Sequence, residues 1–255
     1  MRNFGLIGFP LGHSFSARFF NDKFKSESIS AHYSNFELPD IGDLTELLAE
    51  YPDIEGFNVT IPYKELILPY LSDISAEASA IGAVNTVNVT YPDGDSGPRL
   101  SGFNTDAPAF ARTLAPMLSA TDTSPCKALV LGTGGAAKAV RHALVSLGVT
   151  SESVSRSKDN GDLTYNDLTG DIIESHRIIV NATPLGTFPD TDSCPPIPYQ
   201  FLSARHICYD LVYNPAETLF TRNAAKHGAT VKNGMDMLRL QALMSWEIWN
   251  SGSRY

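Results

Sequence analysis

The chain has 255 residues, a formal net charge of −9 at pH 7 and 43% hydrophobic residues. This length suits one large domain or two modest ones, and either can bury a core without disulfides or metals. The acidic balance excludes broad electrostatic binding to nucleic acid or to an anionic membrane, and no apolar run approaches the roughly 18 residues of a membrane-spanning helix. The hydrophobic fraction excludes wholesale disorder.

Short apolar runs alternate with helical patterns, which is typical of α/β architecture. In chain order, the patterns predict strands at 4–8, 32–38, 56–61, 83–90, 127–131, 152–155, 177–181, 206–212 and 229–232. They predict helices at 17–24, 43–50 (with Asp43 as its cap), 76–81, 107–118, 136–147 and 237–250. Between these elements we expect a turn-rich connection at 91–98, a polar connector at 119–125 and a long loop at 184–198.

These elements favour two domains. A nucleotide-binding domain is predicted at 106–236, and a second domain at 1–105 together with the returning C-terminal segment 237–255. The three cysteines form no CxxC pair, so we expect neither a disulfide framework nor a metal site. Glycines and a proline interrupt the apolar N-terminal stretch, which argues against a secretory signal and favours the cytoplasm.

Two serines follow the first predicted strand. Ser14 and Ser16 are spaced by one residue, so their hydroxyls can reach one ligand from a loop. Such a pair suits an anionic or hydroxylated substrate, because each hydroxyl donates one hydrogen bond. A helix cap before the helix at 17–24 explains the same residues, and from these residues alone it is the favoured interpretation.

Polar residues also gather on and after the third predicted strand. Asn58 and Thr60 share one strand face, and Lys64 follows shortly after. This pattern predicts either a binding wall or an edge strand that faces water. Two further segments, 81–86 and 102–106, place amide and carboxylate groups beside glycines, and each is a weak signal alone.

A glycine-rich loop directly follows the strand at 127–131 and precedes a helix, which is the context of a dinucleotide fingerprint. Gly132 allows a tight turn, and Gly134 lets the backbone approach a pyrophosphate that the helix N-terminus stabilises. Ala137 replaces the third glycine, as the fingerprint permits. The alternative is a glycine-rich turn without a ligand, and the strand–loop–helix context weighs against it.

The end of the following strand bears on the choice of nucleotide. An acidic residue there favours NAD, whereas an arginine favours the 2′-phosphate of NADP. Arg156 is a bidentate phosphate ligand by chemistry, Lys158 adds charge, and Ser155 and Ser157 can donate hydrogen bonds. Glu152 is the competing acid. We predict that the strand ends near Arg156 and that NADP binds; a solvated basic turn is the alternative.

Eight motifs, in order over essentially the whole chain, resemble those of the shikimate dehydrogenases. They are Gly8-x-Pro10…His13-Ser14-x-Ser16, Asn58-Val59-Thr60-x-Pro62-x-Lys64, Gly82-Ala83-Val84-Asn85-Thr86, Gly102-x-Asn104-Thr105-Asp106, Gly132-x-Gly134-Gly135-Ala136, Asn181-Ala182-Thr183-Pro184, Asp210-x-x-Tyr213-Asn214-Pro215 and Asn233-Gly234-Met235…Gln241. One such motif is weak, whereas eight in order are specific.

The resemblance implies an α/β fold with an N-terminal substrate domain, a Rossmann-type NADP-binding domain and a C-terminal helix that returns to the substrate domain. It implies NADP-dependent reversible reduction of 3-dehydroshikimate to shikimate, in the biosynthesis of aromatic amino acids. By the same resemblance, Lys64 and Asp106 are the catalytic pair. The implied substrate ligands are Ser14, Ser16, Asn58, Thr60, Asn85, Tyr213 and Gln241. The implied cofactor contacts are Gly132, Thr133, Gly134, Gly135, Ala136, Ser155, Arg156, Ser157, Thr183, Leu211 and Gly234.

The sequence departs from the family pattern in places. Ser155 stands where Asn is usual, and Asp236 and Arg239 replace small residues. Two other functions stay open at this point: a quinate/shikimate dehydrogenase with relaxed NAD/NADP use, and a non-catalytic NADP-binding regulatory module. The protein's partners are expected to be small molecules, and both a monomer and a homodimer fit the sequence.

The roles within the catalytic pair follow from charge. A lysine is a cation at neutral pH, so we expect Lys64 to stabilise the oxygen that becomes alkoxide-like during hydride transfer, with Asp106 orienting Lys64 and a substrate hydroxyl. A proton shuttle through the pair is the alternative. Gln241 is a polar residue on an apolar helix, which is compatible with a core amide as well as with a ligand contact.

Overall fold

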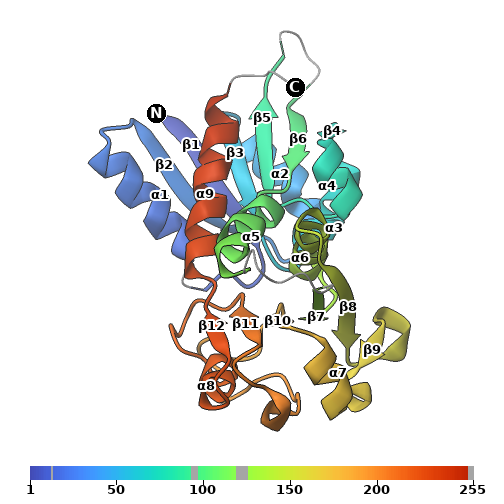
Figure 1. The fold of residues 1–255 in the computed structure, drawn as a ribbon. Helices are drawn as coiled ribbons and strands as arrows, with labels where there is room; N and C mark the ends of the chain where they lie inside the picture. The colour runs from blue at the N-terminus through green and yellow to red at the C-terminus, as the bar shows by residue number, and fades with distance from the viewer. Residues whose placement is uncertain (13, 93–96, 119–125, 252–255) are drawn as a thin grey trace. The chain divides into compact units, whose positions relative to one another are not determined.

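Two six-stranded sheets organise the protein, one in each of two units (Figure 1). The computed structural model describes residues 1–12, 14–92, 97–118 and 126–251. The first unit comprises Met1–Thr105 and Ala242–Tyr255, and the second comprises Asp106–Gln241. The chain therefore returns to the first unit within its last helix, α9 (Met235–Asn250).

The first unit is built on a mixed sheet. Its elements are β1 (Arg2–Gly8), α1 (Phe15–Ser26), β2 (Ala31–Glu37), η1 (Ile41–Asp43), α2 (Leu44–Glu50), β3 (Ile54–Val59), α3 (Tyr63–Leu66), η2 (Leu68–Tyr70), β4 (Asp73–Ile74), α4 (Ala76–Ile81), β5 (Thr86–Thr90) and β6 (Arg99–Phe103). The strand order is β2-β1-β3-β5-β6-β4. β1 runs parallel to β2 and β3, while β5 is antiparallel to β3 and β6.

The second unit is built on a parallel sheet. Its elements are α5 (Asp106–Leu114), η3 (Ala115–Met117), β7 (Lys127–Leu131), α6 (Gly135–Ser146), β8 (Thr150–Ser155), η4 (Lys158–Asn160), β9 (Leu163–Thr164), η5 (Tyr165–Asp167), α7 (Gly170–Ser175), β10 (Ile178–Asn181), η6 (Tyr199–Phe201), β11 (Ile207–Asp210), α8 (Leu219–Lys226) and β12 (Thr230–Lys232), followed by the first turns of α9. The strand order is β12-β11-β10-β7-β8-β9, and every pair is parallel.

This order reverses direction at β7, because the chain adds β8 and β9 on one side and then β10, β11 and β12 on the other. In open parallel sheets, ligands bind beyond the carboxyl ends of the strands at such a reversal. β7 and β10 are almost wholly buried, which explains their continuous apolar sequences. The glycine-rich loop lies directly after β7, at this switch point.

The predicted α/β architecture is confirmed, and the elements at 76–81 and 127–131 have the predicted bounds. Other expectations are wrong in detail. The strands expected at 83–90 and 206–212 span only Thr86–Thr90 and Ile207–Asp210. The strand at 56–61 ends at Val59, and the helix at 107–118 is α-helical only to Leu114, because Pro116 has no N–H to continue it. Asp43 makes no capping hydrogen bond; the Asp40 side chain accepts from Gly42 N instead.

Several short elements escaped prediction, among them β6, α7 and α8. The last of these begins with a capping box in which Thr221 stands where Glu or Gln is usual, so the familiar signature is missing. Residues 182–198 contain neither helix nor strand, as expected of the loop. The Asp93-Gly94 turn, the connector at 119–125 and His13 lie outside the described residues.

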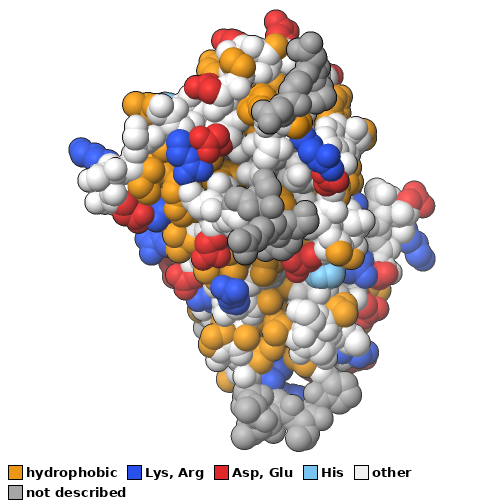
Figure 2. Space-filling model, turned by 90° about the horizontal axis from the view of Figure 1, so that it is seen from above, with side chains coloured by type: hydrophobic (Ala, Val, Ile, Leu, Met, Phe, Trp, Pro, Cys, Tyr) orange, Lys and Arg blue, Asp and Glu red, His pale blue; other side chains and the backbone are white. Residues whose placement is uncertain are grey.

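The polar surface carries both signs of charge. On the face in Figure 2, the described acidic and basic side chains are interspersed. Within the described ranges, no helix is both long enough and apolar enough to cross a bilayer.

Helix α9 is fixed to the first sheet through Trp249. Its indole ring stacks on Phe4 with 4.8 Å between ring centroids, and its Nε1 donates to Val87 O over 2.9 Å. Gly56 on β3 makes this contact possible, because a Cβ at that position would lie 2.3 Å from Trp249 Nε1. The backbone of β3 thus serves as the surface on which the indole rests.

We predict that Gly56→Ala lowers the free energy of unfolding by about 1–3 kcal/mol, because the added methyl group overpacks the Trp249 contact. Urea denaturation followed by tryptophan fluorescence measures this change. Gly134→Ala is the control, since a Cβ there meets no atom within 4 Å. Equal stability of the two variants would contradict this explanation.

Candidate active site

Asn58 is the centre of a buried hydrogen-bond network in the first unit. Its Nδ2 donates to Asn85 O over 3.1 Å and to Ser245 Oγ over 2.9 Å, while its Oδ1 accepts from the Tyr33 hydroxyl over 2.8 Å. A backbone carbonyl can only accept, so the contact with Asn85 fixes the amide orientation. β3 is an inner strand and Asn58 is buried, so the alternative of an edge strand facing water is wrong.

Asn85 holds the segment that leads to Asp106. Its Oδ1 accepts from Thr105 N over 2.7 Å, and its Nδ2 donates to Thr105 Oγ1 over 2.9 Å. Asp106 is the next residue, begins α5 and is buried. Thr86 and Ser245 join the same network through a hydroxyl–hydroxyl contact of 2.7 Å. Asn85 therefore fixes the backbone immediately before the predicted catalytic carboxylate.

Ser14 and Ser16 lie at the start of α1. Ser14 is the N-cap, and its Oγ accepts from Ala17 N over 3.4 Å, so the helix-cap interpretation is confirmed for this residue. Ser16 is buried near Tyr33, whose hydroxyl donates to Asn58 Oδ1. The carboxylate of Glu37 accepts from Leu11 N over 2.6 Å and so holds the loop before these serines.

Lys64 and Thr60 follow β3. Thr60 N donates to Ile7 O over 2.9 Å, which ties this segment to the end of β1. Lys64 lies on α3 and is half-buried. Its carbonyl accepts from the N–H of Val84, the residue that precedes Asn85, over 2.7 Å. The first unit thus brings Thr60, Lys64 and Asn85 to one region, where β1 and β3 end and β5 begins.

The glycine loop of the second unit has the features that a dinucleotide requires. Gly132 has φ +111°, a conformation that L side chains rarely adopt, and a Cβ there would lie 3.1 Å from Ala182 O. Gly134 is the N-cap of the 12-residue helix α6 and provides no side-chain cap, and a Cβ at this position would meet no atom within 4 Å. Thr133, Gly135 and Ala136 complete the loop and first turn. These residues fit a bound pyrophosphate.

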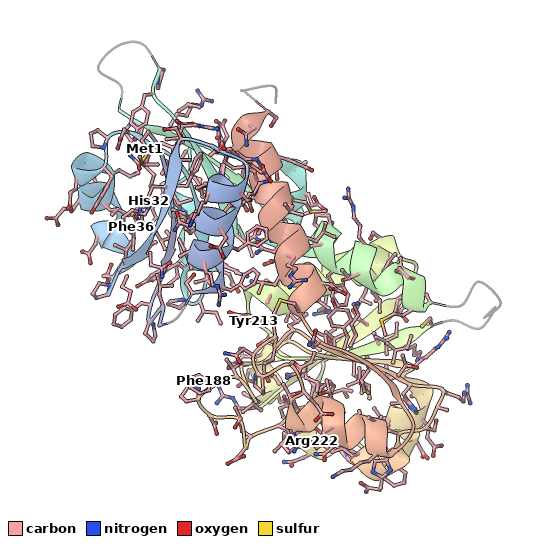
Figure 3. The ribbon with its side chains drawn as sticks, turned by 90° about the vertical axis from the view of Figure 1, so that its left-hand side faces the viewer. Met1, His32, Phe36, Phe188, Tyr213 and Arg222 are labelled. Atoms are coloured by element: carbon pink, nitrogen blue, oxygen red, sulfur yellow. The ribbon has the colours of Figure 1, made fainter. Side chains whose placement is uncertain are left out.

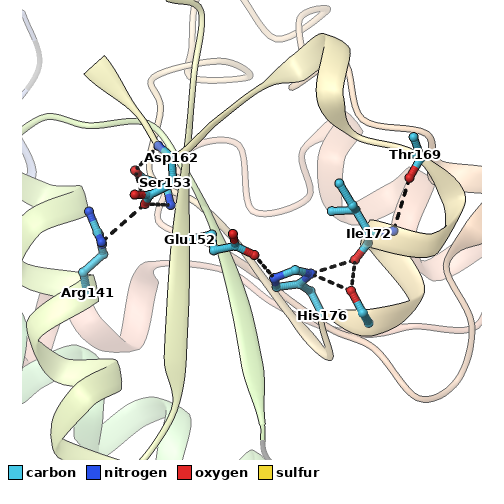
Figure 4. Close-up of polar contacts among 8 residues, drawn as sticks. Arg141, Glu152, Ser153, Asp162, Thr169, Ile172 and His176 are labelled. Carbon is cyan, nitrogen blue, oxygen red and sulfur yellow. Dashed lines mark hydrogen bonds and ion pairs between the residues drawn. The ribbon is translucent and has the colours of Figure 1, made fainter. Parts of the chain in front are cut away.

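The end of β8 favours NADP over NAD. Arg156 follows the last strand residue and is exposed, and Ser155 Oγ accepts from Ser157 N over 3.2 Å. The competing acid, Glu152, pairs with Leu129 in mid-strand and accepts from His176 Nε2 over 2.8 Å (Figure 4). Glu152 is therefore engaged away from the strand end. The three residues directly after that end, Arg156, Ser157 and Lys158, are basic or carry a hydroxyl, and Asp159 follows them.

A buried carboxylate lies where β10 and β11 end. Asp210 pairs in register with Asn181 and is wholly buried. Its Oδ2 accepts from the Thr218 hydroxyl over 2.6 Å, and its Oδ1 accepts from Asn181 Nδ2 over 2.9 Å and from Val212 N over 3.0 Å. Burial raises the pKa of the Asp210 carboxyl to about 6, although these three hydrogen bonds oppose the rise.

The remaining predicted contacts of the second unit surround this end of the sheet. Thr183 Oγ1 donates to Asn181 Oδ1 over 2.6 Å. Gly234 packs on the segment after β11, because a Cβ there would lie 2.1 Å from Leu211 O. Tyr213 lies on that same segment and is half-buried (Figure 3). Gln241 is buried, and its Nε2 donates to Leu238 O within α9 over 2.9 Å.

The departures from the family pattern are accommodated locally. The Asp236 carboxylate accepts from Lys232 Nζ over 2.6 Å, and this contact lowers the pKa of Asp236. Its negative charge is thus paired within the same unit. Arg239 is exposed.

Sequence patterns did not reveal five residues of these networks as hydrogen-bonding partners of the predicted ligands: Tyr33, Thr105, Asn181, Asp210 and Ser245. Each lies inside a predicted motif or element, but Tyr33, Thr105 and Ser245 do not stand out by charge or spacing. The one available signal is a polar residue within an apolar run, as at Asn181 and Asp210, which end two otherwise apolar strands.

The fold and these residues define an α/β protein with a dinucleotide-binding unit and a separate unit that carries a buried polar site. The family model "Shikimate dehydrogenase substrate binding domain" matches residues 6–87. Shikimate dehydrogenase (NADP(+)) of Carboxydothermus hydrogenoformans is 34% identical over 265 residues, covering 98% of this chain and 91% of the relative. The chain belongs to the shikimate dehydrogenase family.

Solved structures agree with this membership. The shikimate 5-dehydrogenase of Thermus thermophilus, in complex with NADP(H) and shikimate, is 32% identical with a TM-score of 0.83, covering 98% of this chain and 94% of that chain. The shikimate dehydrogenase of Aquifex aeolicus is 30% identical with a TM-score of 0.84, covering 100% and 94%.

The raised pKa of Asp210 predicts a pH-dependent stability difference from Asp210→Asn. The native state holds this proton more tightly than the unfolded chain, in which the pKa of the carboxyl is near 3.8. The stability that the protonated carboxyl contributes is therefore fully present below that pH. It is lost as the pH rises through about 6. The unfolding free energy of the wild type relative to Asp210→Asn should fall by about 2 kcal/mol between pH 4 and pH 7. Urea titrations measure it, and a constant difference would contradict the burial argument.

Proposed function

We propose that the protein is an NADP-dependent oxidoreductase that interconverts 3-dehydroshikimate and shikimate by hydride transfer, within aromatic amino acid biosynthesis. The observation that carries this proposal is the joint presence of the φ +111° glycine loop with Arg156 beyond it and of the Asn58 network beside Lys64, in a chain of this family. The names of the relatives, which are NADP-dependent shikimate dehydrogenases, support the same reaction and cofactor.

The domain roles follow from the two units. We assign residues 1–105 and 237–255 to substrate binding and residues 106–236 to NADP. The pyrophosphate would rest on Gly132–Ala136, at the end of β7. Arg156 beyond β8, with Ser155 and Ser157, would then hold the 2′-phosphate. Thr183, Leu211 and Gly234, which lie beyond β10 and β11 on the other side of β7, would then hold the other half of the dinucleotide.

The proposed substrate residues differ in whether their polar groups already make hydrogen bonds within the protein. Asn58 and Asn85 each use both their amide and carbonyl groups inside the protein, so we assign them to shaping the site as well as lining it. Ser14, Ser16 and Thr60 supply hydroxyl donors for a carboxylate and ring hydroxyls. Tyr213 and Gln241 complete the proposed set.

When bound, NADP supplies or accepts the hydride. In the reduction, Lys64 donates a hydrogen bond to the substrate oxygen as negative charge develops on it. That oxygen then takes a proton from water or, in the proton-shuttle alternative, from the Lys64 ammonium. Asp106 holds the Lys64 ammonium and a substrate hydroxyl in place. Each of these interactions strengthens as the oxygen gains charge, which is the condition for lowering the barrier.

The finer parts of the proposal concern location and assembly. Cys194 and Cys208 carry free thiols, which suits the reducing cytoplasm. The proposed partners are small molecules only, and the protein acts as a monomer or homodimer.

Purified protein mixed with shikimate and NADP should produce NADPH, followed by its absorbance. Parallel reactions use quinate in place of shikimate and NAD in place of NADP. Turnover of either with a comparable kcat/KM would support the alternative with broader specificity. Folded protein that binds NADPH but forms no reduced nicotinamide in any of these reactions would overturn the enzymatic proposal and leave the regulatory alternative.

Lys64→Ala should lower kcat by about 10²–10³-fold with little change in KM, because the lost interaction is made mainly in the transition state. Steady-state kinetics with shikimate measure both constants. The matched control is Lys25→Ala, an exposed lysine at the end of α1. A kcat within twofold of the wild type would exclude both the donor and the proton-shuttle role.

Arg156→Ala should lower kcat/KM for NADP by about 10–100-fold, because a charge-assisted pair with phosphate contributes about 1.5–3 kcal/mol. The value for NAD, which has no 2′-phosphate, should change less than twofold. Arg205→Ala, an exposed arginine of the same unit, serves as the control. Equal losses with the two nucleotides would contradict the assignment of Arg156.

A further inference from the structure

Asp210 joins two segments that the proposed function assigns to ligand binding. Its two carboxylate oxygens have separate tasks: Oδ2 faces the Thr218 hydroxyl at the start of α8, while Oδ1 accepts from Asn181 Nδ2 and from Val212 N. No exposed surface remains on this residue. A buried carboxylate costs free energy of desolvation unless hydrogen bonds offset it, so its retention at this position calls for a role.

The first segment is reached through Asn181. The amide of Asn181 donates to Asp210, so its Oδ1 faces the other way and accepts from Thr183 N over 3.1 Å and from Thr183 Oγ1 over 2.6 Å. If the Asn181 amide turned over, an NH2 group would face both Thr183 donors. The Asp210 carboxylate, with the shorter of the two contacts of Asn181 Nδ2, and Leu185 O, which accepts from the same Nδ2 over 3.3 Å, together select the amide orientation that holds Thr183.

The second segment begins directly after β11. Val212 N donates to Asp210 Oδ1, which fixes the backbone between Leu211 and Tyr213. Val212 O in turn accepts from Gly234 N over 3.1 Å, and Gly234 packs against the Leu211 carbonyl. The position of this segment thus depends on the same carboxylate oxygen that orients Asn181.

We propose that Asp210 is a positioning residue whose Oδ1 sets Thr183 and the Leu211–Tyr213 segment in one fixed arrangement for the dihydronicotinamide half of NADPH. The inference rests on the proposed function, which assigns Thr183, Leu211 and Gly234 to the cofactor. Asp210 acts through Asn181 and Val212 and contacts neither cofactor nor substrate.

This role requires an acceptor at Oδ1 and does not require a charge. In Asp210→Asn, the amide oxygen can stay at the Oδ1 position, and the new NH2 group faces Thr218 Oγ1, which can accept. Asp210→Ala removes the acceptor for both Asn181 and Val212. Thr218→Val removes the donor to Oδ2 and also the side-chain cap of α8, but it leaves the Oδ1 contacts intact. It therefore separates loss of stability from loss of positioning.

The test measures the Kd of NADPH by its fluorescence, with the intact protein and these three variants, alongside thermal unfolding and the KM for shikimate. We expect Asp210→Ala to raise the Kd at least tenfold, and Asp210→Asn to restore it to within threefold of the wild type. Thr218→Val should lower the unfolding temperature while leaving the Kd within twofold.

The outcomes separate the two proposals. If wild-type protein binds NADPH and turns over shikimate but Asp210→Ala binds as tightly as the wild type, the positioning role is overturned and the proposed function stands. The role is also overturned if Thr218→Val weakens binding as much as Asp210→Ala, because stability alone then explains the loss. Wild-type protein that binds no NADPH overturns the proposed function and this inference together.

Discussion

A buried polar group must find a hydrogen-bond partner, and this requirement shapes both units. In the described part of the chain, every buried side-chain nitrogen and oxygen has a partner. Burying one of these atoms without a hydrogen-bond partner would destabilise the fold by about 1–3 kcal/mol. The two largest networks surround Asn58 and Asp210, at strand ends where the backbone stops pairing and loops begin. The same hydrogen bonds that make burial tolerable also hold the proposed ligand-binding residues in place.

The two networks use different devices for the same purpose. Around Asn58 the partners are hydroxyls and a backbone carbonyl, so the network is neutral and joins helix α9 to the sheet through Ser245. Around Asp210 an ionisable group accepts from three donors in the dense parallel sheet. In the proposed function, the first arrangement is the wall against which a polyhydroxylated acid would bind. The second fixes two loops at the carboxyl edge, where a dinucleotide binds in such sheets.

Sequence patterns predicted the parts of this protein that depend on local chemistry. The strand at 127–131 and the loop after it could be predicted, because a short apolar run followed by Gly132 and Gly134 is compatible with few other structures. The Asn58 network was not accessible, because its partners Tyr33 and Ser245 are distant in sequence and neither residue type is unusual in a strand or a helix. Helix α8 was missed because the third helical residue of its capping box is a second threonine, Thr221, where the familiar signature has Glu or Gln. Ser14 illustrates a third case, since the pattern predicted both a cap and a ligand and the structure tests only the cap.

In the proposed reaction, the protein itself transfers a hydride between NADPH and a ketone of the substrate. The most direct measurement incubates the protein with 3-dehydroshikimate and NADPH that carries deuterium at both C4 positions, and analyses the product by mass spectrometry. Direct hydride transfer predicts shikimate that is one mass unit heavier, with the deuterium on the carbinol carbon. Shikimate without deuterium, or no shikimate from folded protein that binds NADPH, would contradict it.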